Sequence, residues 1–235
     1  MKVIRIIAIL SVFCGTVFIA VKSGKSIDNL ITAKETIIQT TFETETTTEN
    51  QTETTTETTS ETTTEQKRYE IENWEAISGN ISVKVNLSTN TVTAYKGDTP
   101  IKAMICSSGY YTPTGSFRVS DKYRWHYLLG NVSGQYCTRI YGKILIHSIP
   151  YYSQNIHSLC TEEYNKLGTT CSHGCIRMQA ADAKWIFDNC PSGTSVVLYE
   201  DNKNPGPLGK PEISQIPVNQ TWDPTDPEIV NAISQ

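Results

Sequence analysis

Alternating hydrophobic and polar residues predict several short β-strands in the middle of the chain. A side-chain period of two is typical of a strand that buries one face. The first two runs are joined by a Leu-Ser-Thr-Asn turn, which predicts a β-hairpin, and a Pro-Thr-Gly turn precedes the fourth run. The predicted strands span residues 81–85, 91–95, 101–105, 116–119 and 140–146.

A single helix is predicted late in this region. Ala183, Ile186, Phe187 and Cys190 follow the spacing of one helical face, and the segment begins near residue 180 and ends before a Pro-Ser-Gly sequence. Residues 195–199 then form a last apolar strand. Many short strands with one late helix favour a mainly β domain of sandwich or barrel-like form.

The N-terminal residues 1–25 predict export. Lys2 and Arg5 precede an apolar run from Ile6 to Val21, whose length lies between that of a signal peptide and that of a minimal membrane span. The segment is therefore a signal anchor or a signal peptide. No clear small-residue cleavage site follows it, which favours a membrane anchor over residues 6–21 and an extracytoplasmic domain.

Residues 26–66 predict a disordered spacer. Between Thr40 and Glu65 there are 15 Thr and 7 Glu, so this stretch cannot bury enough apolar surface to offset the entropy of folding. Residues 67–200 then form one domain, and residues 201–235 are rich in Pro and predict an extended tail. A multidomain enzyme is excluded.

Charge argues against a nucleic-acid partner. The formal net charge is −4, but the Thr- and Glu-rich tract contributes −7, which leaves about +3 on the rest of the chain. Nucleic-acid binding usually requires a dense basic stripe, and a mild excess spread over the chain does not supply one.

Candidate chemistry is concentrated between Thr170 and Arg177, which enclose two thiols and an imidazole. Cys175 is the candidate nucleophile, and such a thiol needs a lowered pKa, a nearby base and donors for the oxyanion. Gly174 allows close backbone approach, so the amides of Gly174 and Cys175 are candidate donors. Arg177 offers a planar cationic group that suits a carboxylate.

The motif Ser172-His-Gly-Cys-Ile-Arg177, with Ile144-Leu-Ile-His-Ser148 upstream, resembles the active-site signature of the L,D-transpeptidase catalytic domain. This family consists of bacterial cell-wall enzymes, and the resemblance covers about residues 81–199. Other similar segments are Ser107-Ser-Gly109, Thr112-Pro-Thr-Gly-Ser-Phe117, Tyr164-Asn-Lys-Leu-Gly168, Asp182-Ala-Lys-Trp185 and Gly193-Thr-Ser-Val-Val197.

The resemblance implies that Cys175 attacks the third residue of a peptidoglycan stem peptide and expels the terminal D-alanine. The resulting thioester passes to the amine of a neighbouring stem as a 3→3 cross-link, without a cofactor or metal. It also implies that carbapenem-type inhibitors acylate Cys175. Alternatives are an L,D-carboxypeptidase, in which water resolves the thioester, a non-catalytic wall-binding module, and a zinc site built from the clustered Cys and His.

Two histidines compete for the role of base. His147 ends a predicted strand, and His157 lies closer to Cys175 in sequence; both are followed by Ser. Strand context favours His147, because a rigid element fixes a side chain better than a loop does. Ser148 is then expected to orient this base through its side chain or its main chain.

The remaining motif residues have two readings each. His173 lines the oxyanion pocket or hydrogen-bonds beneath the loop. Arg177 binds a substrate carboxylate or holds the loop through backbone carbonyls.

Export would allow disulfides among the remaining cysteines. The candidate pairs are Cys160 with Cys171, closing a loop over the site, and Cys106 with Cys137. A bridge between Cys171 and Cys175 would instead block the nucleophile and make the enzyme redox-gated.

Overall fold

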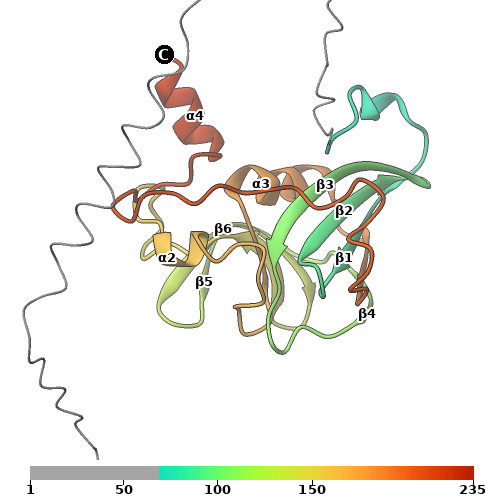
Figure 1. Cartoon of the computed structure of the whole chain (residues 1–235), viewed down its shortest axis with the longest axis horizontal. Coiled ribbons are helices and arrows are strands. Elements are labelled where there is room, and N and C mark those ends of the chain that lie inside the picture. The colour runs from blue at the N-terminus through green and yellow to red at the C-terminus, as the bar shows by residue number, and fades with distance from the viewer. Residues whose placement is uncertain (1–68) are drawn as a thin grey trace, which may run out of the picture. The chain divides into compact units, whose positions relative to one another are not determined.

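The structure, a computed structural model, describes residues 69–235 (Figure 1). The predicted anchor over residues 6–21 and the spacer over residues 26–66 lie outside the described residues. Within residues 69–235, no helix has the length and apolar character needed to cross a membrane.

In the described part of the chain, the domain is built on one sheet of nine strands. Their order across the sheet is β4-β9-β1-β2-β3-β8-β7-β6-β5. Two neighbouring pairs are parallel, β1 with β9 and β7 with β8, and the other pairs are antiparallel. The strands are β1 (Ile81–Asn86), β2 (Thr91–Lys96), β3 (Thr99–Ser107), β4 (Gly115–Arg118), β5 (Lys122–Leu128), β6 (Val132–Tyr141), β7 (Ile144–Ser148), β8 (Ile176–Met178) and β9 (Ser195–Tyr199).

The sheet curls so that its two ends approach each other. Directly after β4, the Val119 N–H donates to the Thr194 carbonyl beside β9, and the Ser120 N–H donates to the Arg139 carbonyl in β6. The rings of Phe117 in β4 and Tyr141 in β6 lie 5.0 Å apart. The prediction of a mainly β, barrel-like domain is therefore confirmed.

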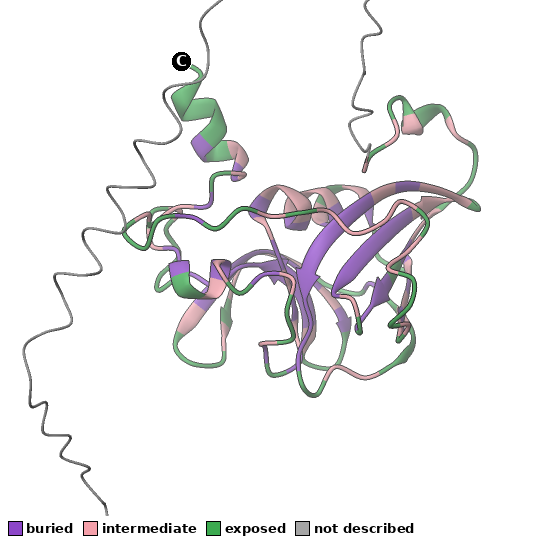
Figure 2. Cartoon of the chain, in the orientation of Figure 1, coloured by how far each residue is buried: buried purple, intermediate pink, exposed green. Residues whose placement is uncertain are grey.

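The main hydrophobic core lies between the curled sheet and helix α3 (Ala180–Asn189) (Figure 2). Ala183 and Ile186 of α3 are fully buried against it. Ile146 of β7 and Ile176 of β8 point into the same core, because they are register partners in the parallel pair. The apolar helical face predicted from the sequence is the face of α3 that packs against the sheet.

Three short helices were absent from the sequence prediction. They are η1 (Trp74–Ala76), α2 (Thr161–Tyr164) and α4 (Pro227–Ile233). The predicted strands also omitted β5, β8 and most of β6, and the single strand predicted over 140–146 is divided by the turn between β6 and β7. In β5 and β6, polar and aromatic residues occupy both faces, and the burial pattern does not alternate.

The C-terminal tail crosses the domain and ends in α4 (Figure 1). It begins beside β1, where the Asn86 side-chain amide donates to the carbonyls of Asp201 and Asn204. Further on, Ile216 exchanges two hydrogen bonds of 2.9 Å with the Asn165 side chain. The prediction of a wholly extended tail is wrong for its last residues, where Asp226 caps α4 and Pro227 begins it.

Candidate active site

The register of two strands sets the candidate active site. In the parallel pair of β7 and β8, His147 lies beside Arg177. Side chains alternate along a strand, so His147 and Arg177 lie on the face opposite to the core residues Ile146 and Ile176. Cys175 directly precedes β8 and lies two residues from Arg177, and it lines the same cavity as His147. The structure thus brings Cys175, His147 and Arg177 together.

The loop that carries Cys175 is fastened to the segment after β3. The N–H of Tyr110 donates to the Ser172 carbonyl, and the N–H of Tyr111 donates to the His173 carbonyl. The two segments approach so closely at Gly109 that an added Cβ would lie 2.3 Å from the Gly174 nitrogen. Glycine is therefore required at residue 109, which explains the Ser-Ser-Gly motif.

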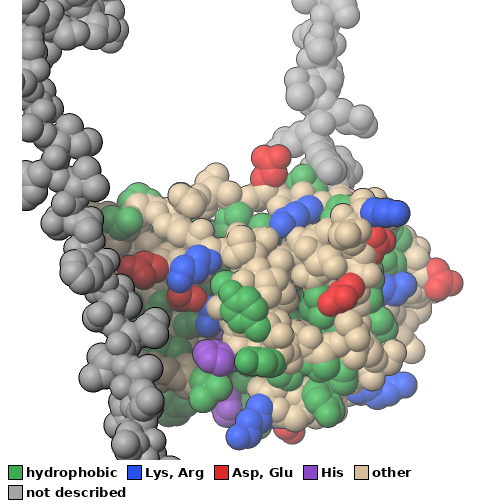
Figure 3. All heavy atoms as spheres, turned by 60° about the horizontal axis from the view of Figure 1, so that its bottom comes forward, with side chains coloured by type: hydrophobic (Ala, Val, Ile, Leu, Met, Phe, Trp, Pro, Cys, Tyr) green, Lys and Arg blue, Asp and Glu red, His purple; other side chains and the backbone are tan. Residues whose placement is uncertain are grey.

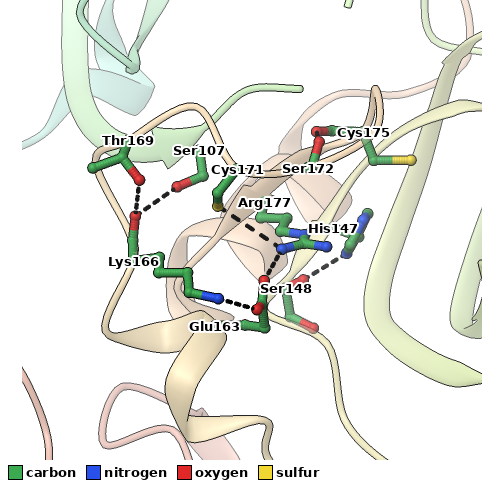
Figure 4. Close-up of polar contacts among 10 residues, drawn as sticks. All are labelled: Ser107, His147, Ser148, Glu163, Lys166, Thr169, Cys171, Ser172, Cys175 and Arg177. Carbon is green, nitrogen blue, oxygen red and sulfur yellow. Dashed lines mark hydrogen bonds and ion pairs between the residues drawn. The ribbon is translucent and has the colours of Figure 1, made fainter. Parts of the chain in front are cut away.

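His147 is held as a neutral imidazole. Its side chain is 1% exposed, and its Nδ1 lies 2.5 Å from the Ser148 carbonyl oxygen, so Nδ1 carries the proton that it donates. Burial lowers its pKa from 6.5 to about 3, and the charge of Arg177 acts in the same direction. The other nitrogen, Nε2, remains an acceptor and is directed to the side where the Cys175 sulfur lies (Figure 4).

Cys175 differs from the sequence prediction in its protonation. Its Sγ lies 3.7 Å from the Lys143 carbonyl oxygen, an acceptor that favours the thiol. Burial raises the pKa of Cys175, and the Leu145 N–H and the charges of Arg177 and Arg139 oppose that rise only in part. The expected lowered pKa is therefore wrong, and the resting pair is a thiol and a neutral imidazole. A proton must leave the sulfur during the attack.

Arg177 is paired with a carboxylate from another part of the chain. Its Nη1 donates to Glu163 of α2, and the same nitrogen lies 3.9 Å from the Cys171 sulfur (Figure 4). Lys166 also donates to Glu163, at 2.6 Å. Arg177 thus ties α2 to β8 through a carboxylate side chain, whereas one of its two readings from the sequence was contact with backbone carbonyls. Its guanidinium also lines the cavity.

Ser148 and Ser172 act through hydrogen bonds to the main chain. The Ser148 hydroxyl accepts from the Gln135 N–H at 2.9 Å and donates to the Ile149 carbonyl at 2.8 Å. Ser148 therefore contacts His147 through its carbonyl only. The Ser172 hydroxyl donates to the Cys175 carbonyl at 2.6 Å, which closes the turn before the nucleophile.

His173 and Gly174 flank the nucleophile in different ways. The His173 side chain is exposed at the cavity, so it does not pack beneath the loop. Gly174 is buried, and its carbonyl accepts from the Thr112 hydroxyl at 2.8 Å.

The cavity in front of Cys175 has a volume of about 410 Å³. Three cationic residues line it, Arg139, Lys143 and Arg177, and no Asp or Glu of the described residues does. The hairpin of β5 and β6 supplies apolar wall residues, including Leu129 and Val132. In a space-filling view of this end of the sheet, histidines lie next to exposed hydrophobic and Lys or Arg side chains (Figure 3). The cavity is suited to a ligand with both apolar and anionic groups.

His157 lies away from this cavity. Its side chain is exposed on the loop after β7, and its backbone N–H donates to the Asn155 side chain at 2.8 Å. The geometry therefore agrees with the choice of His147 as the candidate base.

The expected disulfides are not formed in the described part of the chain. All six of its cysteines are free, so the pairs Cys160 with Cys171 and Cys106 with Cys137 are wrong, as is a bridge from Cys171 to Cys175. The Cys171 sulfur faces the Arg177 guanidinium instead. Among residues 69–235, no group of three or more His, Cys, Asp or Glu side chains is arranged as a metal site.

Glu163 and Gln135 are the site residues that sequence reasoning missed. Glu163 lies outside the motif, 14 residues before Arg177, and the packing of α2 brings the two side chains together. Gln135 is a polar residue with no exposed surface, in the middle of a strand. Because β6 carries several other polar residues, the sequence does not single out Gln135.

Together, the cysteine and the imidazole on one sheet face define a candidate cysteine-nucleophile site on a curled β-domain. Residues 80–198 match the L,D-transpeptidase catalytic domain family, which is about half of the chain. The chain belongs to this family.

Individual proteins are also similar to this chain. YciB of Bacillus subtilis (strain 168), a protein assigned to the L,D-transpeptidases, is 33% identical over 129 residues, covering 51% of this chain and 66% of that protein. A fused amidase, peptidase and peptidoglycan-binding protein of Clostridium acetobutylicum is 30% identical, with a TM-score of 0.40 over 51% of this chain and 52% of the other. L,D-transpeptidase 3 of Mycobacterium tuberculosis, solved with a faropenem-derived adduct, is 22% identical, with a TM-score of 0.41 over 51% of this chain and 60% of that one. The chain thus spans just under two thirds of the curated relative and a little over half of these solved chains.

Proposed function

We propose that this protein is a peptidoglycan L,D-transpeptidase that forms 3→3 cross-links through a thioester on Cys175. The observation that carries the proposal is the cavity shared by the Cys175 thiol and the buried imidazole of His147, whose Nε2 is left as an acceptor by the hydrogen bond at Nδ1. A neutral imidazole of this kind is a general base.

In the first half of the reaction, His147 Nε2 takes the thiol proton as Sγ attacks the carbonyl carbon at the L-centre of the third stem residue. The amides of Gly174 and Cys175 are the proposed donors to the oxyanion, because both residues line the cavity. The imidazolium then gives its proton to the departing amine. D-alanine leaves, and the acyl group remains as a thioester.

In the second half, the side-chain amine of a neighbouring stem attacks the thioester. His147 takes a proton from that amine and returns it to the sulfur, so the thiol is regenerated and one amide bond replaces another. No outside energy source is required, because the acyl energy is kept in the thioester. A reaction that needs no outside energy source suits an extracytoplasmic enzyme. We propose that residues 6–21 anchor the enzyme to the membrane beneath the cell wall.

The charge of the cavity supports an anionic peptide substrate. Stem peptides carry free carboxylates, and the described lining offers Arg139, Lys143 and Arg177 without an acidic residue. Arg177 already pairs with Glu163, and Arg139 pairs with Asp121 at 3.2 Å. Lys143 is exposed at the cavity and is therefore the cation most open to a substrate carboxylate.

The test is to incubate the full-length protein with a purified disaccharide-tetrapeptide and to follow the products by mass spectrometry. Transpeptidation gives a cross-linked dimer with loss of one D-alanine. A trimmed monomer alone would show that water resolves the thioester, as in an L,D-carboxypeptidase. If the substrate is unchanged while Cys175 is confirmed as a free thiol, the proposal is overturned. The remaining function would then be that of a non-catalytic wall-binding protein.

We further propose that carbapenem-type β-lactams acylate Cys175. The expected result is a mass increase equal to that of the drug on the wild-type protein and none on Cys175→Ser. Equal labelling of both proteins would place the reaction at another residue.

A further inference from the structure

A buried carboxylate from the C-terminal tail reaches β6, the strand next to the one that carries the candidate base. Asp226 has no exposed surface, although it lies well beyond residue 198, where the family match ends. Its Oδ1 accepts from the Glu228 N–H at 3.0 Å, and its Oδ2 accepts from the Gln135 side-chain Nε2 at 2.7 Å. The tail is thus bonded to the interior of β6.

The Gln135 amide is fixed at both of its ends. While Nε2 donates to Asp226, Oε1 accepts from Arg124 Nη1 at 2.7 Å. Arg124 also pairs with Glu228 of the tail, and its guanidinium lies 4.2 Å from the centroid of the Tyr136 ring. Because one end must accept and the other must donate, the amide has only one orientation that satisfies both partners.

The backbone next to Gln135 is in an uncommon conformation. Tyr136 has φ of 49°, in the left-handed region that a bulky residue rarely adopts. The ladder between β6 and β7 pairs Thr138 with Ile146, and after β7 an isolated bridge pairs Ser133 with Tyr151. Between these pairs, the Gln135 N–H donates to the Ser148 hydroxyl instead of to a ladder carbonyl.

Ser148 connects this network to the base. Its hydroxyl is held by the Gln135 N–H and the Ile149 carbonyl, and its own carbonyl accepts from His147 Nδ1. We propose that Asp226 and Gln135 are positioning residues, by which the tail holds Ser148 and so keeps His147 in the tautomer with a proton on Nδ1 and an accepting Nε2. The base is then prepared for Cys175 by a segment outside the family domain.

Asp226→Asn tests the proposal by replacing one carboxylate oxygen with an NH₂ group. The asparagine can still cap α4 through its oxygen, but its NH₂ then faces the Gln135 Nε2, and two donors meet. The Gln135 side-chain amide cannot flip, because its NH₂ group would then face the Arg124 guanidinium. We expect the displaced network to free Ser148, so that His147 populates both tautomers.

The direct measurement is ¹⁵N NMR of protein labelled at histidine. The chain has four histidines, so the His147 ring signals can be assigned with a His147→Asn variant. In the wild type we expect a protonated Nδ1 and an unprotonated Nε2, and in Asp226→Asn a shift of both signals towards each other. Unchanged His147 signals in a folded Asp226→Asn protein would overturn the proposal.

Rescue separates positioning from general support of the fold. In the double variant Gln135→Glu with Asp226→Asn, the carboxylate introduced on β6 accepts both from Arg124 and from the amide introduced on the tail, so all partners are complementary again. We expect this variant to recover the wild-type His147 signals, whereas Gln135→Glu alone sets two carboxylates against each other and does not. Glu212→Gln is the matched control, because it removes a charge from an exposed residue of the same tail, and its His147 signals should remain those of the wild type.

The activity readout rests on the proposed function and is kept separate from the NMR readout. With the tetrapeptide substrate, Asp226→Asn should lower kcat about 10- to 100-fold with KM unchanged, and the double variant should restore it. A change in KM and kcat that follows the melting temperature across all variants would indicate a structural role only and overturn the proposal. If no variant turns over substrate, the proposed function fails while the ring signals still decide the positioning role. If Asp226→Asn does not fold, Gln135→Met gives the same test, because it removes the hydrogen bond to Asp226 by a change in β6.

Discussion

Two hydrophobic clusters of the domain differ in how they are built and in what they do for the site. The main core joins the sheet to α3 and is made largely of strand residues. The second cluster joins the loop after β7, the helix α2 and the C-terminal tail; its buried members are Ile149, Tyr151, Leu159, Tyr164, Leu167 and Ile216. The first cluster lies beneath the strands that carry the cysteine and the base.

The segments that form the second cluster also carry the groups that act on the site from behind. Glu163, in α2, pairs with Arg177, whose charge lowers the pKa of His147. Asp226, in the tail, bonds to Gln135. The base lies in β7 and the nucleophile directly precedes β8, whereas their electrostatic and positional adjustment comes from segments packed around the sheet.

The strongest effect should occur at the base itself. His147→Ala should lower the rate of thioester formation about 10²- to 10⁴-fold, because it removes the acceptor for the thiol proton. The rate is measured by the mass gain of Cys175 with the tetrapeptide donor. His157→Ala is the matched control and should acylate at the wild-type rate, since its side chain is exposed outside the cavity. Slow acylation in His157→Ala together with normal acylation in His147→Ala would instead identify His157, in the loop after β7, as the base.

The next largest effect tests the main core. Ile186→Ala should lower the free energy of unfolding by about 2–5 kcal/mol, because Ile186 is fully buried between α3 and the sheet. Denaturant unfolding followed by tryptophan fluorescence measures the loss. Since the sheet depends on this core, both clusters should unfold in one transition. Separate transitions would show that they are independent units.

A smaller effect is expected for the same change in the second cluster. Ile216 is 9% exposed and belongs to a tail that can relax, so Ile216→Ala should cost about 2 kcal/mol, the lower end for such a change. Hydrogen exchange should speed up in α2 and the tail and remain slow in β7 and β8. Equal loss of protection in the strands would mean that the two clusters are not distinct.

The most gradual effect is the pH dependence of stability that His147 contributes, because it is spread over the range between its unfolded and folded pKa values. Its pKa in the folded protein, about 3, lies below the ordinary 6.5, so the unfolded chain binds the extra proton first. This contribution is complete above pH 6.5 and is lost as pH falls towards 3, by at most about 1.4 kcal/mol per pH unit. The difference between wild type and His147→Asn in unfolding titrations isolates it from the carboxylates. A difference that does not vary with pH would contradict the buried neutral imidazole.

Much of the sheet and the reacting pair could be predicted from the sequence. The alternation over 81–85 and 101–105 marks strands, because burying one face of a sheet requires a period of two. The motif around Cys175 and the strand end at His147 indicate a nucleophile and a base, because few other residue types supply that chemistry. By contrast, β5 and β8 give no such signal.

Other features involve groups from different segments of the chain, which meet only in the folded domain. The pKa of Cys175 depends on its burial, and burial is a property of the packed domain and not of a motif. The free cysteines, the pairing of Arg177 with Glu163 and the reach of Asp226 to Gln135 have the same origin. Local sequence determines hydrogen-bonding periods and residue chemistry, whereas the distances between remote side chains are fixed only when the core excludes water and the chain closes around it.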